Sequence, residues 1–358
     1  MQQELTDKEK HTLYGLVRYP LSTDKHLAKL LSLKHSTITA IRQRLHKSNF
    51  YRSVVIPRLQ NLGCKMLVVI YTNFSPLIPL EERVRITGKT IEVFEEIFFS
   101  VGEQEKGFSL SLSKDYATIG RINDIRTQTF GGRGLLENEY PNMVVFPFEI
   151  SRIYRFFDFA PLLNKHFSLN IPQSGDMPNF GTVTHHDSEM TETEKNVYTL
   201  MVKYPEESDT ILGGKLGISR HTISRLRRGF EQQMLIRRMN LPNLKNLGFE
   251  ILSFYHIRFD PRRPRDLEDP EIARLMSDST IFFASRLFEA IMISVHRDYD
   301  EYKQDSTQMM QVLKEKKWVA ENPLILTYSL SSLIIIKDFA FAPLAKKIVG
   351  CTLDLKSS

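Results

Sequence analysis

The chain has 358 residues, of which 42% are hydrophobic and 25% charged, so it is globular in composition and too long for one ordinary domain. Its net charge of +6 permits a polyanionic partner without requiring one. The two cysteines, Cys64 and Cys351, lie far apart and in no CxxC spacing, which argues against a disulfide framework and a cysteine-based zinc site.

Neither the start of the chain nor its longest apolar run suggests export or membrane insertion. The first ten residues are polar and lack the basic-then-apolar pattern of a signal peptide. The run over residues 326–345 is interrupted by serines, a lysine and an aspartate, so a buried strand is predicted there. We expect a cytoplasmic protein with no membrane partner.

The sequence contains an internal duplication. Residues 5–63 and 190–248 align without a gap at an offset of 185 and share 18 identities in 59 positions. Chance would give only a few identities, so the chain consists of two related halves.

Each copy begins with a helical pattern. In the first half, helices are predicted over residues 5–18 and 36–47, with a second helix between them that is capped by Ser22 or Thr23 and contains residues 27–31. Two β-prone segments follow, over residues 50–56 and 65–74. Thr6 and Glu9 have the spacing of a capping box, and Pro20 stops the first helix. Three helices closed by a β segment are typical of a winged helix-turn-helix.

From residue 65 onward, strand-like and helical segments alternate in the order βαββαβ. In the first half they lie at residues 66–74, 80–94, 96–101, 108–112, 116–130 and 143–154. In the second half they lie at residues 251–259, 270–276, 281–285, 291–296, 299–319 and 324–336. This order predicts a ferredoxin-like module, in which four antiparallel strands carry two helices on one face.

The predicted fold class is α+β, with two winged helix-turn-helix domains each followed by a ferredoxin-like βαββαβ domain. The domains are placed at residues 1–63, 64–167, 190–248 and 249–358, with a proline- and glycine-containing linker at 168–189. His185 and His186 lie in the linker without partners at the spacing of a metal site, so no metal is expected.

Residues 219–233, SRHTISRLRRGFEQQ, have the pattern of an exposed reading helix. Ser219 is a good N-cap. Apolar residues recur at helical spacing on one face, at Ile218, Ile223, Leu226 and Phe230. The other face carries arginine, hydroxyl and imidazole groups, which suit phosphates and base edges in a major groove. The alternative is a basic surface helix that is merely solvated.

Residues 5–63 and 190–248 resemble the Lrp/AsnC class of archaeal and bacterial transcription regulators. The resemblance lies in the opening LTxxE, the LAxxLxLxxSTI turn and the segment ending in NLG before a βαββαβ module. It covers nearly the whole chain apart from the linker. It implies winged helices that bind double-stranded DNA, and ferredoxin-like modules that bind a small-molecule effector and oligomerise.

Two departures from that family's pattern matter. Members usually carry one copy per chain, so two fused copies imply an intramolecular pseudodimer, which either stops there or pairs again as a homodimer. Lys34 and His35 stand where the reading helix usually opens with serine and arginine, whereas Ser219 and Arg220 keep those residues. The first helix is therefore expected to dock less specifically, on a site that need not be a palindrome.

We predict a sequence-specific DNA-binding transcription regulator with no enzymatic activity and no cofactor. The predicted contacts from the two reading helices are Ser36, Thr37, Thr39, Arg42, Arg44, Arg220, His221, Thr222, Ser224, Arg225, Arg227 and Arg228. The predicted wing contacts are Arg52, Arg237 and Arg238, and for the last two plain strand exposure is the alternative.

The same fold is also used by siroheme decarboxylases of haem synthesis, and such an enzyme is the alternative prediction. Those enzymes look recognisable by an HNYxR cluster in the second module, and no HNY occurs in this sequence. The residues of the second module that could face a carboxylated ligand are His256, Arg258, Arg286, His296 and Arg297.

Overall fold

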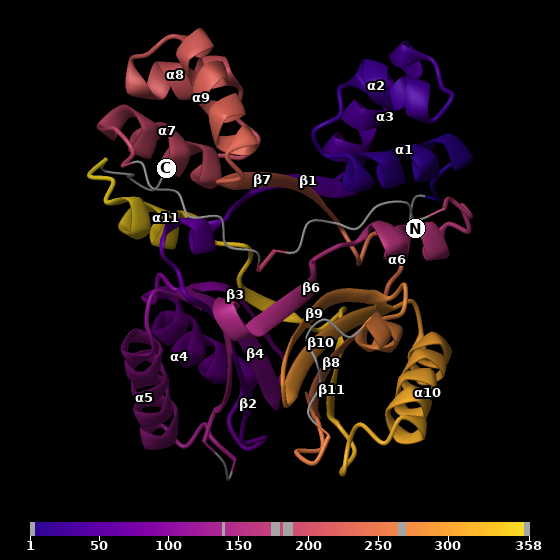
Figure 1. The fold of residues 1–358 in the computed structure, drawn as a ribbon, viewed down its shortest axis with the longest axis vertical. Helices are drawn as coiled ribbons and strands as arrows, with labels where there is room; N and C mark the ends of the chain where they lie inside the picture. The colour runs from indigo at the N-terminus through magenta and orange to yellow at the C-terminus, as the bar shows by residue number, and fades with distance from the viewer. Residues whose placement is uncertain (1–3, 138–139, 173–179, 182–188, 264–269, 354–358) are drawn as a thin grey trace. The chain divides into compact units, whose positions relative to one another are not determined.

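The computed structural model describes residues 4–137, 140–172, 180–181, 189–263 and 270–353. The chain is a mixed α+β protein with two five-stranded antiparallel sheets (Figure 1). It divides into two compact units: unit 1 comprises Met1–Ser53, Ile150–Gly181 and Arg238–Leu333, and unit 2 comprises Val54–Glu149, Thr182–Arg237 and Ile334–Ser358. Each unit thus takes segments from both halves of the sequence. The domain boundaries predicted along the sequence stay a prediction.

Unit 1 contains the first helical trio, α1 (Asp7–Arg18), α2 (Asp24–Leu30) and α3 (His35–Lys47). The predicted capping box is present, because Glu9 Oε2 accepts a hydrogen bond from the Thr6 backbone N–H at 2.8 Å. The trio shares a core of fully buried side chains, among them Leu13, Leu27, Ile38 and Leu45. A further helix, α6 (Ala160–His166), lies against α1.

Unit 2 repeats this arrangement with α7 (Glu192–Lys203), α8 (Asp209–Leu216) and α9 (Arg220–Gln232). The first of these begins with the same capping box, formed by Thr191 and Glu194. The helix α11 (Ala342–Val349) lies against α7, as α6 does against α1 in unit 1. The duplicated sequence therefore forms two similar helical trios.

In a closed winged unit, the strand after the helical trio pairs with the next strand along the chain. Here the strands after the two trios pair with each other instead. β1 (Tyr51–Pro57) and β7 (Ile236–Pro242) form a two-stranded sheet with each other, and neither pairs with the strand that follows it in sequence. In unit 1, Asn240 accepts from Ser53 Oγ at 2.7 Å and donates to the Leu16 carbonyl at 2.8 Å. The coarse α+β fold is thus confirmed, whereas two complete winged helices are not.

Each unit has one larger sheet covered by helices on one face (Figure 1). In unit 2 the order is β12-β3-β4-β2-β5, with β2 Met66–Asn73, β3 Ile97–Gly102, β4 Lys106–Ser113, β5 Asn142–Pro147 and β12 Ile334–Lys337. Its covering helices are α4 (Leu80–Glu92) and α5 (Tyr116–Gly132). In unit 1 the order is β11-β8-β10-β9-β6, with β6 Ser151–Phe156, β8 Ile251–Arg258, β9 Thr280–Arg286, β10 Glu289–His296 and β11 Leu324–Ser329. Its cover is α10 (Tyr299–Glu315) and the short 3-10 helix η3 (Pro270–Leu275).

Each larger sheet is completed by a strand from the other half of the sequence. We predicted single strands over residues 143–154 and 324–336, and each is in fact two strands that belong to different sheets. β5 ends at Pro147, which has no N–H to donate, and the 3-10 turn Phe148–Ile150 separates it from β6. A turn over residues 330–332 separates β11 from β12.

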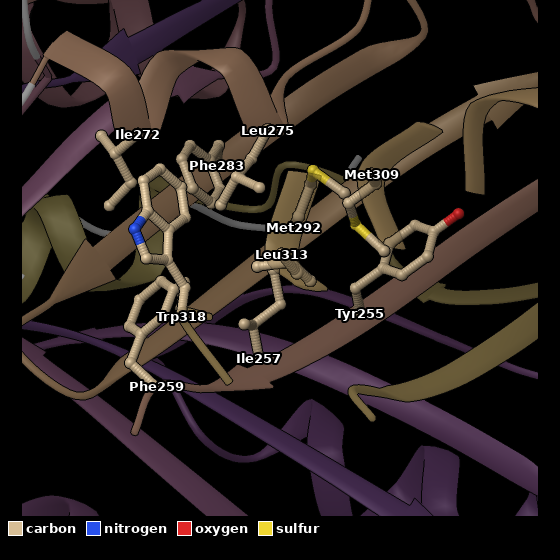
Figure 2. Close-up of a cluster of buried hydrophobic side chains, with 11 residues drawn as sticks. Tyr255, Ile257, Phe259, Ile272, Leu275, Phe283, Met292, Met309, Leu313 and Trp318 are labelled. Atoms are coloured by element: carbon tan, nitrogen blue, oxygen red, sulfur yellow. The ribbon is translucent and has the colours of Figure 1, made fainter. Parts of the chain in front are cut away.

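The core of unit 1 beneath α10 and η3 is apolar. Residues 270–276 were expected to form the second element of a βαββαβ module, and they form only the short η3. Figure 2 shows side chains from η3, the strands and α10 pointing at one another in this core. The buried members are Tyr255, Ile257, Phe259, Ile272, Leu275, Phe283, Ala290, Met292, Met309, Leu313 and Trp318.

The turn between α8 and α9 passes so close to α8 that position 213 of this helix must be a glycine. A Cβ on Gly213 would lie 2.6 Å from the Ile218 backbone oxygen, so the turn would have to shift. We expect Gly213→Ala to lower the free energy of unfolding by about 1–3 kcal/mol, measured by urea denaturation. Gly214→Ala is the matched control, because a Cβ there meets no atom within 4 Å. Its better helix propensity should raise stability by up to about 1 kcal/mol. Equal effects of the two substitutions would contradict this account.

Candidate functional site

α9 is held at the surface of unit 2 by a short turn and a serine cap. Gly217 ends α8 in the left-handed conformation, with a φ of 67°, which glycine adopts without strain. Ser219 Oγ then accepts from the Thr222 N–H at 3.2 Å. Ile223 and Phe230 are buried, so the opposite face of α9 points to solvent as predicted.

The solvent face of α9 carries guanidinium groups without counter-charges. Arg220, Arg225 and Arg228 are exposed, as is His221 beside them. Among the described residues, no carboxylate lies within ion-pair distance of these three arginines. Arg228 makes only long hydrogen bonds, at 3.4 Å, to Ser224 of its own helix. These cations are therefore available to a polyanion.

Arg227 and Arg42 behave differently, because each joins two helices of its own trio. Arg227 forms an ion pair with Asp209 at the start of α8. Arg42 Nε lies 2.7 Å from Asp24 Oδ1 at the start of α2, and the two pairs are related by the same offset of 185 residues. Both arginines were predicted to contact DNA, and the structure engages both in fixing the second helix against the third.

Two further predicted contacts of α3 also bind within unit 1. Thr39 Oγ1 donates to Asp24 Oδ2 at 2.7 Å, and Arg44 forms an ion pair with the capping residue Glu9. Of the remaining two predicted contacts, Ser36 is exposed and Thr37 is half-buried. At the positions of Arg225 and Arg228, α3 carries Ala40 and Gln43. α3 therefore lacks the exposed, unpaired arginines of α9, although Arg44 and Lys47 are exposed on it.

The predicted wing residues lie on strands of the two-stranded sheet. Arg52 belongs to β1, and Arg237 and Arg238 belong to β7. All three are half-buried, and each already interacts with another group of the protein. The structure thus places them on paired strands and not at the tip of a hairpin.

The residues of the alternative enzyme prediction fall on opposite faces of the sheet. His256 Nε2 lies 3.6 Å from Glu289 Oε1, and Arg286 pairs with the same carboxylate. His296 Nε2 lies 2.8 Å from Ser253 Oγ, and its Nδ1 lies 3.5 Å from an oxygen of Asp305. By strand alternation, His296 points toward α10 with Met292, whereas His256 points to the other face of the sheet.

Arg258 and Arg297 complete that set, and Arg258 lies opposite Glu289 in the strand register. Arg258 is exposed at the end of β8, and Arg297 Nε lies 3.0 Å from an oxygen of its neighbour Asp298. The second module therefore pairs most of its candidate cations with its own carboxylates.

A different group of cations lies in the interior of unit 2, between its sheet and α4 and α5. Arg83 of α4 and Arg126 of α5 are only 1% and 2% exposed. Arg126 Nη1 donates to Ser109 Oγ at 2.8 Å, and its guanidinium lies 5.7 Å from the centre of the Phe130 ring. The guanidinium of Arg83 lies 4.7 Å from the centre of the Phe74 ring.

Neither buried arginine has a carboxylate partner among the described residues. Nε and Nη2 of Arg83 and Nε of Arg126 make no hydrogen bond there, and neither do the Thr72 and Ser111 hydroxyls on the same face of the sheet. Burial lowers the pKa of each guanidinium to about 10, so both remain charged at neutral pH. The interior of unit 2 thus carries two positive charges that the protein does not neutralise.

Neither arginine was among the site residues predicted from the sequence. Arg126 takes an inward position on α5 together with Ile119, Ile122 and Phe130, and Arg83 is buried on the inner side of α4. A cation within an otherwise apolar helical stripe was the signal that could have identified them.

The described residues contain neither a metal-binding cluster nor a membrane-spanning helix. There, no three histidine, cysteine, aspartate or glutamate side chains form a group that could hold a metal ion. No helix of these residues combines the length and the apolar character needed to cross a bilayer. His185 and His186 lie outside the described residues.

No protein-family model and no curated protein matches the sequence. The siroheme decarboxylase NirDL matches in structure with a TM-score of 0.48 and 9% identity, over 96% of this chain and 98% of that one. The same enzyme in co-complex with an iron-uroporphyrin III analogue matches with a TM-score of 0.49 and 10% identity, over 96% and 99%. A transcriptional regulatory protein of the AsnC family from Pyrococcus furiosus matches with a TM-score of 0.31 and 18% identity, over 40% and 89%.

At these identities the likeness concerns the fold alone. The resemblance to Lrp/AsnC regulators is confirmed only in part, because the regulator structure matches 40% of the chain. The expectation that the chain has no enzymatic activity is overturned and is not retained. Two structures of an enzyme, the siroheme decarboxylase NirDL, match nearly its whole length.

The ion pairs of Glu289 make stability depend on pH. The nearby His256 ring, and then the Arg286 guanidinium, lower the pKa of Glu289 from 4.5 to about 2 against the opposing effect of burial. Because the folded-state pKa is the lower one, this stabilisation is complete above about pH 4.5 and is lost as the pH falls toward 2. Between pH 5 and 3, the free energy of unfolding should fall by about 2 kcal/mol more in the unmodified protein than in Glu289→Gln. Parallel pH profiles from urea denaturation would contradict this assignment.

Proposed function

We propose that the chain is a cytoplasmic DNA-binding transcription regulator in which α9 enters the major groove. One observation carries this proposal: Arg220, Arg225 and Arg228 lie on the solvent face of α9 without counter-charges. Guanidinium groups suit both phosphate oxygens and the O6 and N7 acceptors of guanine. In this proposal, α7–α9 with β7 and α1–α3 with β1 act as the two winged helix-turn-helix elements.

The two reading helices are unequal in this proposal. α3 offers Ala40 and Gln43 where α9 offers Arg225 and Arg228. We therefore expect specific contacts from α9, mainly backbone contacts from α3, and a target site without full palindromic symmetry. A small-molecule effector bound at the sheets, and further pairing of two chains, belong to the same proposal.

Arg225→Ala tests the proposal, because it gives α9 the residue that α3 carries at Ala40. If Arg225 reads a base, affinity should fall by about 1–3 kcal/mol and sequence preference should relax at one position. Binding would be titrated with the chain's own promoter duplex and with random duplex, over a series of salt concentrations.

The matched control is Arg121→Ala, which removes an exposed arginine from α5, away from the helical trio. Its affinity should equal that of the unmodified chain at every salt concentration. Unchanged affinity and preference in Arg225→Ala would remove this residue from the interface. Absence of duplex binding at low salt would reject the proposal that the chain is a DNA-binding regulator.

A second candidate function is enzymatic, on a carboxylated tetrapyrrole. Two of the similar structures are of a siroheme decarboxylase, one of them with an iron-uroporphyrin III analogue. The observation in this chain that favours such an activity is the pair Arg83 and Arg126, because unneutralised guanidinium groups can hold substrate carboxylates. The sequence departs from those enzymes in lacking HNY.

Incubation with siroheme tests this candidate by mass spectrometry of the tetrapyrrole. Decarboxylation of an acetate side chain breaks one C–C bond, leaves the electron pair on the methylene carbon, takes up one proton there and releases CO₂. We expect Arg126→Met to abolish product and Arg121→Met on the same helix to leave it unchanged. A chain that binds no tetrapyrrole and forms no product is not such an enzyme.

A further inference from the structure

We infer that the interior of unit 2 binds a small dicarboxylate, with one carboxylate on Arg83 and the other on Arg126. As a substrate site it rests on the second proposed function, whose class of ligand it names. As a binding site it is supported by three observations: the two buried charges, the small polar residues of the sheet, and the methionines that replace Ser109 and Arg126 in the second half of the chain.

The two buried charges of the interior favour a ligand that carries two negative charges. Arg83 and Arg126 are both almost fully buried, and neither has a carboxylate within ion-pair distance among the described residues. Burying a charge without a partner is strongly unfavourable, and an arginine cannot escape this cost by losing its proton near neutral pH. Two carboxylates would neutralise both groups and accept the N–H donors that now make no hydrogen bond.

Part of the sheet face beneath α4 and α5 is small and polar. Thr72 of β2, Gly102 of β3, and Gly107, Ser109 and Ser111 of β4 lie on this face, beside Val68 and Ile70 of β2, which belong to the apolar cluster under the two helices. Small and polar residues are unusual at buried positions under a helical layer. The hydroxyls of Thr72 and Ser111 make no other hydrogen bond within the described structure, so they are available to an anion.

The second half of the chain supplies an internal comparison. When the strands are aligned by register and the helices by their N-caps, Ser109 corresponds to Met292 and Arg126 to Met309, each 183 residues later. Both methionines belong to the closed apolar cluster of unit 1 in Figure 2. The fold therefore needs no arginine at this place, and an apolar pair takes the place of the Ser109–Arg126 hydrogen bond.

The two guanidinium groups lie close enough together for one short dicarboxylate to reach both. Arg83 Nη1 lies 3.5 Å from the place of a Cβ on Gly102, and Arg126 is bonded to Ser109. Gly107, the partner of Gly102, is two residues from Ser109 on the same face of β4. The two groups thus lie over sheet positions about 7 Å apart, a separation that a short carbon chain between two carboxylates can span.

Thermal unfolding of the full chain with glutarate or succinate, at constant ionic strength, tests the inference. We expect a saturable rise in Tm with these dicarboxylates and none with acetate or inorganic phosphate. Calorimetry with glutarate should show affinity at least tenfold weaker in Arg126→Met and unchanged in Arg121→Met, which alters an exposed residue of the same helix.

The double variant Ser109→Met with Arg126→Met reproduces the methionine pair of the second half. It should fold, have a higher Tm without ligand, and show no response to glutarate, so the test does not depend on Arg126→Met folding alone. A glutarate response shared by the double variant, or a response to phosphate without one to dicarboxylates, would overturn the inference. Glutarate binding without product from siroheme supports the dicarboxylate site and rejects the proposed decarboxylase activity. Product from siroheme without any glutarate response supports that activity and rejects the dicarboxylate site.

Discussion

Backbone hydrogen bonding at two strand edges governs how the chain folds. In unit 2, β3 pairs with β4 on one side and with β12 on the other, and in unit 1, β9 lies between β10 and β6. Without these fifth strands, the N–H and C=O groups of β3 and β9 would be open to pairing with other chains. Both fifth strands come from the other half of the sequence, so neither half can complete its own sheet.

The helices that follow the exchanged strands extend the same constraint. α6 comes directly after β6 and lies against α1, and α11 comes directly after β12 and lies against α7. Each trio is therefore tied to the sheet of its unit by a segment from a distant part of the sequence. Fusion of the two copies into one chain keeps these partners together at a fixed stoichiometry.

Local patterns predicted most of the elements, because caps, stops and hydrophobic period are local properties. The capping box at Thr6 and the cap of α9 at Ser219 were found at the expected places, and Thr191 forms the matching capping box in the second copy. Strand partners were harder, because a strand that pairs with β2 and one that pairs with β9 look alike in sequence. The break at Pro147 was the visible clue to the separation of β5 from β6.

The candidate sites show the same division between local and distant causes. The basic face of α9 follows from its sequence alone, whereas the engagement of Arg42 and Arg227 requires knowing where Asp24 and Asp209 lie. Those two ion pairs are the same in both copies, and they hold the helical framework constant. The solvent faces of α3 and α9 and the interiors of the two sheets have changed around it, so the copies share a scaffold and differ in what they offer to a ligand.

The exchanged strands also impose an order on synthesis. The ribosome delivers β2 to β5 long before residues 334–349, which supply β12 and α11. Until those residues emerge, the nascent sheet of unit 2 has a bare edge at β3 and α7 lacks its neighbour. A polypeptide cut short by a few dozen residues thus loses the closure of a sheet made some two hundred residues earlier, and it exposes a template for aggregation.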